Sequence, residues 1–584
     1  MFAALVPSPG LTFDPENPIF DAPMPAVESV GSPSVDSTLS IEATNTYIKS
    51  FFEHFYPSLP LVHRPTFTTA STPKTLMNIT AIIGSLYTAQ SYSKEEQVTC
   101  ANWRRKAWED GYDELSNLTS SDWKELGKTW VIQAWLLHII YGAYLGDGSH
   151  YEMAKQMLRS LVDAIRELGV LQQSTAFPLA TSWIAQSKRS PLRSESQPLQ
   201  ECWMAYVNEE SMRLSLYVLL FLDTQISSPC NLRPLISPIE FGWELPYSSS
   251  LWEANNAHNW LQRLSDEYLG PSTSPYGELH LERGKATSSL SLATQELMSE
   301  CPSPGLLATL QASPFATLCV LTNLDQLVRD FTRCYYQLPP NLSDPSAFHI
   351  LTQSQNRQVM AAIRIVTKMV QQPPKPSQAL LWHAIELMTF SIKVSLCQPD
   401  ELLIGGVVDT SLVAGLATAT HLTLGSYVAV RRSAPFRLQQ KSKDDGALSI
   451  ISELLTGLSR IMAVEELGFA AREAPWATVA SFRMLLMIWQ VLRRATSEIR
   501  KHIKAENKAP EKFEPSMLIF SALMEALVGF AADETRYSRD SDVLSSLDES
   551  EALFMKIIFR ICQSRSVWGI GDAMEKLMEE IKVE

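Results

Sequence analysis

The chain has 584 residues, of which 45% are hydrophobic and 19% charged, and its formal net charge is −14. This composition is typical of a folded soluble protein, and a content of only 24 glycines argues against a turn-rich all-β architecture. Domains that bind nucleic acids take most of their affinity from a basic surface, so the bulk charge argues against a chain that grips DNA by itself.

Residues 1–40 contain seven prolines, five acidic residues and no basic residue, with Phe2, Phe13 and Phe20 among them. A segment of this composition cannot bury enough apolar surface to fold alone. Two interpretations stay open, an acidic–aromatic activation segment or a disordered leader. Order is predicted to begin near Ile41, where apolar residues at three- and four-residue steps indicate a helix that Pro57 and Pro60 end.

Residues 131–145 are apolar on every side apart from Gln133 and His138, which predicts the central helix of a bundle. His138 is expected to be a core residue with its polar atoms satisfied, although a pocket-lining role stays open.

A second helix is predicted directly after this one. Ser149 and Glu152 have the spacing of a capping box, and Gly169 follows the last apolar residue as a C-cap. The pattern predicts two antiparallel helices joined by a short turn.

Residues 203–222 predict a helix with an acid inside its apolar face, and Asp223 is expected to end it. A buried carboxylate needs a partner, and Arg213 lies three residues after Glu210, where it can supply one. We expect these two residues to lock helices together as an internal ion pair rather than to act in catalysis. The side of the helix that holds the acid consists of Trp203, Val207, Glu210, Leu214, Tyr217 and Phe221.

The C-terminal half is also predicted to be helical, and no segment shows the alternation of a strand. The longest near-continuous apolar run, 214–222, is about half the roughly 20 residues that a transmembrane helix needs, so no membrane span is predicted. The predicted helices cover residues 353–372, 377–397, 409–430, 448–473, 479–503, 516–533 and 546–581.

The chemistry-bearing residues form no recognisable catalytic or metal-binding motif. None of the eight cysteines forms a C-x2-C pair, and His54, His63 and His383 lack companions at the spacing of a zinc site. Nucleophile elbows, phosphate-binding loops and dinucleotide fingerprints are absent from the sequence. We therefore expect no catalytic residue, no cofactor and no metal. Asp444 and Asp445 are expected to lie in a solvated loop.

Two further features suggest binding. The basic run of Arg493, Arg494, Arg500, Lys501, Lys504, Lys508 and Lys512 could meet phosphates, although a solvated helix end is the simpler interpretation. A helical bundle with Trp, Tyr and Met around a cavity could bind an apolar effector, with core packing as the default explanation.

The segment from Tyr47 to Phe67, which includes Pro60, His63, Arg64, Pro65 and Phe67, resembles the opening of the fungal-specific transcription factor domain, also called the middle homology region. A second match is Trp203, then Glu209 or Glu210, Arg213 and Asp223, succeeded by Leu245-Pro246, Trp252 and Trp260. The resemblance covers about residues 44–335. Residues 379–397 resemble the segment after this domain in members that carry two N-terminal zinc fingers, and no such finger is present in this sequence.

The resemblance implies an all-α fold, built as a large multi-helix bundle of one or two closely packed domains. The expected organisation is a leader (1–40), a middle homology domain (41–335) and a C-terminal helical region packed on it (336–584). It also implies a nuclear, non-enzymatic regulator of transcription that acts on a metabolic or biosynthetic gene set.

The partners that the resemblance implies are the transcription machinery or a related regulator, with homo- or heterodimerisation and a small-molecule effector as options. Direct DNA contact stays open, and no membrane contact is expected. The alternatives are an all-α biosynthetic enzyme and a degenerate scaffold that titrates a related regulator.

Overall fold

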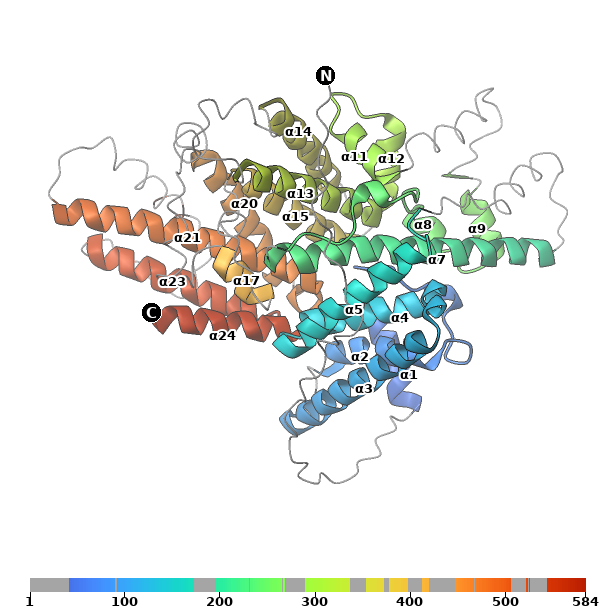
Figure 1. Cartoon of the computed structure of the whole chain (residues 1–584). Coiled ribbons are helices and arrows are strands. Elements are labelled where there is room, and N and C mark those ends of the chain that lie inside the picture. Colours follow the sequence, from blue (N-terminus) through green and yellow to red (C-terminus); the bar gives the residue numbers. More distant parts are fainter. Residues whose placement is uncertain are drawn as a thin grey trace, which may run out of the picture. The chain divides into compact units, whose positions relative to one another are not determined.

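The structure is a computed structural model, and it describes residues 41–89, 92–172, 196–230, 232–264, 266–267, 289–336, 353–371, 378–397, 412–419, 447–466, 468–505, 521, 523, 525 and 543–583. The fold is all-α, as predicted (Figure 1). Within the described residues the one β contact recorded is an isolated bridge between Glu244 and Ser289. Residues 1–40 lie outside the described part, and so do Asp444, Asp445, Lys508 and Lys512.

Helix α4 lies at the centre of the first helices of the amino-terminal half. The chain order is α1 (Ile41–Ser50), α2 (Lys74–Thr88), α3 (Lys94–Ser121), α4 (Thr129–Tyr144), α5 (Gly148–Glu167), α7 (Ser196–Ser227), α8 (Ser249–Trp252), α9 (Ala257–Leu264), α11 (Leu290–Leu297), α12 (Pro304–Ala312) and α13 (Pro314–Tyr336). Every residue of α4 from Val131 to Tyr144 is buried, as its all-round apolar composition predicted. It contacts α2, α5 and α7.

The carboxy-terminal helices are α14 (Gln353–Val370), α15 (Ala379–Cys397), α17 (Leu412–Ala419), α20 (Ala447–Glu466), α21 (Pro475–Ala505), α23 (Val543–Gln563) and α24 (Gly569–Val583). α15 packs against α13, α14, α20 and α21, and α23 lies beside α21 and α24 (Figure 1). Residues 41–584 form one compact unit, and α13 crosses the predicted domain boundary at 335/336. The three-part organisation stays a prediction.

Three predicted helix boundaries were wrong. Asp147, not Ser149 with Glu152, caps α5: its carboxylate accepts the amide of His150 and the hydroxyl of Ser149. Asp223 does not end α7, which continues to Ser227. The helix predicted over 546–581 is two helices, α23 and α24, with a turn between them.

The prediction that no segment could span a membrane also needs correction. By length and composition alone, two helices could span a membrane: α15 over Ala379–Leu396 and α21 over Pro475–Lys501. Helices α12 and α13, bent by 112° relative to each other, would add a third candidate if they counted as one span. In the fold, 72% of the first window and 89% of the second are buried inside the protein. Contact with other helices therefore accounts for their apolar character.

Candidate regulatory site

The polar centre of the amino-terminal half is a buried ion pair on α7. Glu210 and Arg213 are 1% and 3% exposed, and the Oε2 atom of Glu210 accepts a 2.6 Å hydrogen bond from Nη1 of Arg213. The other oxygen, Oε1, accepts the backbone amide of Tyr247 at 2.8 Å. Glu209 takes the second prong of the guanidinium at 2.6 Å. The ion pair expected from the three-residue spacing is thus present, with a second acid beside it.

The electrostatics of this cluster are set by burial and by mutual charge. Burial raises the pKa of Glu210, and the opposing effects of Arg213 and the Tyr247 amide favour its ionised form. Burial alone would lower the pKa of Arg213. The negative charges around it, of which Glu210 has the largest effect, raise the pKa instead, so the guanidinium stays protonated. Burial also raises the pKa of Glu209 to about 7. The ring of Tyr247 lies 4.8 Å from the guanidinium carbon of Arg213, a cation–π contact.

The proline-rich turn is anchored to the same region through His63. Its Nε2–H donates to the carbonyl of Trp252 at 2.9 Å, and Nδ1 accepts the hydroxyl of Thr66 at 2.8 Å. The imidazole also lies edge-on to Trp252 and to Trp203, with ring centroids 4.5 and 5.9 Å away. Burial lowers the pKa of His63 to about 4, so it is a neutral structural residue at pH 7.

The other residues of the turn that were predicted from the sequence lie nearer the surface. Arg64 is exposed, and Pro60, Pro65 and Phe67 are half-buried. Phe67 packs on Phe52 with ring centroids 5.3 Å apart. The structure therefore brings His63 to Trp203 and leaves Arg64 at the surface.

Asp223 acts at the far end of α7, where it holds a loop. Its Oδ2 accepts the amide of Ile236 at 2.7 Å, and its side chain is fully buried. Arg166 clamps the same loop from α5, through two hydrogen bonds to Glu240 at 2.7 and 2.9 Å and one to the carbonyl of Leu235. The loop 232–240 is therefore fixed from both sides.

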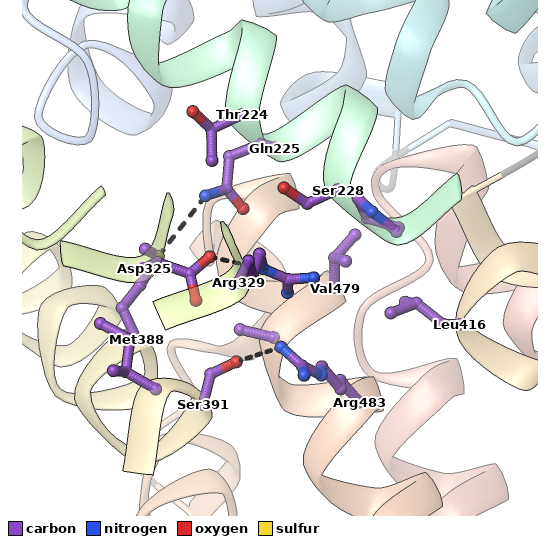
Figure 2. A pocket seen from close by; sticks show the side chains of 13 residues that line it. Thr224, Gln225, Ser228, Asp325, Arg329, Met388, Ser391, Leu416, Val479 and Arg483 are labelled. Atoms are coloured by element: carbon purple, nitrogen blue, oxygen red, sulfur yellow. Dashed lines mark hydrogen bonds and ion pairs between the residues drawn. The ribbon is translucent and has the colours of Figure 1, made fainter. Parts of the chain in front are cut away.

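A polar cavity lies between the end of α7 and the carboxy-terminal helices (Figure 2). Asp325 and Arg329 of α13 form an ion pair of 3.0 Å on its wall, and Arg483 of α21 donates to Ser391 and Ser395 of α15 at 2.8 Å each. Among the described residues, no Trp or Tyr lines this cavity, in contrast to the aromatic cavity that the composition suggested. The lining residues are Thr224, Gln225, Ser228, Pro229, Asp325, Arg329, Met388, Ser391, Ile392, Leu416, Val479, Ala480 and Arg483.

This cavity was not among the features predicted from the sequence. The four-residue spacing of Asp325 and Arg329 was a readable signal of a helical ion pair. Arg329 and Arg483 line the same cavity although they lie 154 positions apart in the sequence, and no local pattern predicts this.

A second buried charge cluster was also not predicted. Glu473 accepts a hydrogen bond of 2.7 Å from Nε of Arg565, and its other carboxylate oxygen lies 3.3 Å from Nε2 of His383. Burial raises the pKa of Glu473, but the charge of Arg565 and the hydrogen bond with His383 outweigh this and lower the pKa to about 2. No group of three or more His, Cys, Asp or Glu side chains within the described ranges has the arrangement of a metal site.

Comparison with known proteins finds one matching family model. Residues 48–308 match the family model described as the fungal specific transcription factor domain. The match begins at the helix before the proline-rich turn and includes all of α7, so the matched region contains both His63 and the Glu210–Arg213 pair.

Similar proteins come from fungi. Over 226 residues the chain is 22% identical to "Zinc finger protein C11D3.17" and over 269 residues 21% identical to "Zinc finger protein klf1", both of Schizosaccharomyces pombe. These alignments cover 39% and 43% of this chain. A third relative, "Nicotinate catabolism cluster-specific transcription factor" of Emericella nidulans, is 23% identical over 246 residues, 42% of this chain. The chain spans 33%, 32% and 26% of the lengths of these three relatives. No solved structure matches.

Proposed function

We propose that this protein is a nuclear regulator of transcription that controls a metabolic or biosynthetic gene set. The observation that carries the proposal is the fungal specific transcription factor domain over residues 48–308, whose core is organised by the buried charges of α7. One relative is named for a nicotinate catabolism cluster, which supports a gene set of that metabolic kind for this chain.

The helical body would act through partners or through a DNA-binding module that these 584 residues lack. Two relatives are named as zinc finger proteins, whereas this sequence has no C-x2-C pair. The net charge of −14 disfavours direct contact of the bulk surface with phosphates. Within the basic run on α21, Arg500 pairs with Asp548 and Glu551 of α23 at 2.5 and 3.0 Å, so part of this positive charge is used inside the protein.

The proposed organisation keeps the acidic leader (1–40), the middle homology domain (41–335) and the helical region after it (336–584). The leader would contact the transcription machinery, and the body would bind a related regulator or a second copy of this chain. Non-enzymatic function is part of the proposal.

A tethering experiment tests this function. The full chain is fused to an unrelated DNA-binding domain and to a fluorescent tag in a fungal host, and transcription of a reporter with the cognate operator is measured. Nuclear fluorescence and a reporter signal that differs at least severalfold from that of the DNA-binding domain alone are expected. Cytoplasmic fluorescence with an unchanged reporter would reject the regulator, and co-purification with a related regulator in that case would point to the titrating scaffold.

A further inference from the structure

The polar cavity described above contains a carboxylate oxygen that is not satisfied. Asp325 is 5% exposed, and its Oδ2 is bound to Nε of Arg329 at 3.0 Å. Its Oδ1 is buried and accepts no hydrogen bond within the described part of the chain. Because a buried carboxylate oxygen without a donor is costly in a protein interior, this atom calls for a donor other than the described protein groups. Figure 2 shows the carboxylate of Asp325 and the guanidinium groups of Arg329 and Arg483 around the same space.

The charges around the cavity favour an anion. Two guanidinium groups, those of Arg329 and Arg483, and one carboxylate, that of Asp325, line this inner cavity, which gives it a charge of +1. Arg233, Glu240 and Asp330 line only the outer pocket and together add −1, so the positive excess belongs to the inner cavity. Arg483 is 5% exposed, so its charge is only weakly screened by water. A ligand that suits this lining combines a negative group for the guanidinium side with a hydrogen-bond donor for Oδ1 of Asp325.

The cavity by itself holds little more than a water molecule, since its volume is about 30 Å³. A larger pocket of about 360 Å³ adjoins it, and the two share Ser228 and Arg329 in their walls. That volume lies within the range of small-molecule sites. The loop 232–240, fixed by Asp223 and Arg166, forms one wall of this outer pocket, and Gln326, Arg329 and Asp330 of α13 contribute to its lining.

We propose that the two spaces form one binding site for a small carboxylate that bears an adjacent amino or hydroxyl group. The carboxylate faces the guanidinium of Arg329, whose planar fork suits it. The amino or hydroxyl group donates to Oδ1 of Asp325. The remaining part of the molecule occupies the outer pocket against Leu232, Pro234 and Leu235.

This inference deepens the proposed function. Its consequence, that occupancy of the site controls transcription, rests on that proposed function. Binding itself is independent of that consequence. Loss of binding with transcript changes intact on deletion would remove this site and leave the regulator. Binding of the acid, together with an unchanged transcript profile on deletion of the chain, would keep this site and reject the regulator.

The test uses the purified full chain and matched sets of three acids that differ in one group: alanine, lactate and propionate; leucine, 2-hydroxy-4-methylpentanoate and 4-methylpentanoate; glutamate, 2-hydroxyglutarate and glutarate. Thermal shift and calorimetry are measured with each acid. In at least one set, we expect the amino or the hydroxy acid to raise the melting temperature in a concentration-dependent way. We also expect it to bind at least tenfold more tightly than the unsubstituted acid. The comparison within each set tells amino from hydroxy acids.

Variants connect the preference to the residues. In Asp325→Asn the amide oxygen stays on Arg329 and the NH₂ group faces the cavity, so the tenfold preference should disappear. Asp330→Asn, an exposed acid that lines only the outer pocket, should keep it. Leu235→Trp fills the outer pocket without touching the ion pair and should abolish binding, which keeps the test decisive if Asp325→Asn does not fold. The proposal is overturned if no acid shifts the wild-type protein, if the three members of every set bind alike, or if Asp325→Asn or Leu235→Trp leaves binding and preference unchanged.

Discussion

Glu210 and Arg213 lie one helical turn apart on α7, and their side chains meet at 2.6 Å in the interior of the protein. Both oxygens of Glu210 are occupied, one by Arg213 and the other by the amide of Tyr247. The pair therefore connects α7 to the segment before α8. It joins sequence elements 37 residues apart.

Arg213→Ala should destabilise the protein strongly, because it leaves Glu210 buried and without its cation. Breaking a buried pair by removing one partner costs about 3–5 kcal/mol. The matched control is Lys128→Ala, since Lys128 forms an ion pair of the same length and spacing with Glu125 at the surface. That loss should stay within about 1 kcal/mol. Chemical denaturation of both variants measures the difference, and equal losses would show that burial of the α7 pair has no energetic consequence.

His63→Ala should loosen the proline-rich turn. It removes the hydrogen bonds to Trp252 and Thr66 and leaves a gap beside Trp203, for an expected cost of about 2–4 kcal/mol. The adjacent Arg64→Ala alters an exposed side chain and should change stability by less than about 0.5 kcal/mol. Melting temperatures of the two variants are compared, and equal values would show that His63 does not anchor the turn.

Asp223 predicts a specific pH dependence. Burial raises its pKa to about 6 from an ordinary value of 3.8, so between these two values the folded protein binds the proton more tightly than the unfolded chain does. The contribution of Asp223 to stability is therefore present below about pH 4 and is lost as the pH rises through about 6. Other groups, such as His63, titrate in the same window with the opposite sign, so the informative quantity is a difference between proteins.

The variant Asp223→Asn isolates this effect, because it removes the titration and keeps an oxygen for the Ile236 amide. Melting temperatures of wild type and variant are compared from pH 4 to pH 7. The melting temperature of the variant relative to wild type should rise with pH across this interval. A constant difference would mean that Asp223 does not titrate there.

Gly569 occupies a place where no side chain fits. A Cβ atom there would lie 1.9 Å from the carbonyl oxygen of Leu145, a backbone atom that cannot move aside. Gly569→Ala should therefore cost more than about 2 kcal/mol through overpacking. Gly148→Ala is the control, since nothing lies within 4 Å of its added Cβ. Similar unfolding free energies for the two variants would contradict the close approach of α24 to the α4–α5 turn.

The sequence predicted features with a local origin. The all-round apolar run of α4 and the three-residue spacing of Glu210 and Arg213 each lie within one helix, so the local pattern was sufficient. The cap of α5 was missed because Asp147 competes with Ser149 for the same amides, and the carboxylate of Asp147 accepts from both His150 and Ser149.

The remaining features come from contacts between distant segments. The break between α23 and α24 places Arg565 against Glu473 and Trp568 beside Phe55, and none of these pairings is visible in a window of neighbouring residues. Gly569 and Gly571 were the sequence signal that could have indicated this break. Both glycines lie against neighbouring backbone atoms, which leaves no room for a side chain. The cavity around Asp325 and Arg483 could not be predicted for the same reason, because it exists only once α7, α13, α15 and α21 are packed.

The most direct test of the regulator is the transcript profile of a strain that lacks this chain, complemented with wild type or with Arg213→Lys, which keeps the buried charge. We expect a limited set of metabolic or biosynthetic genes to change severalfold on deletion and to return with the wild-type chain. An unchanged profile under conditions in which the protein is made, together with substrate turnover by the purified chain, would contradict the account.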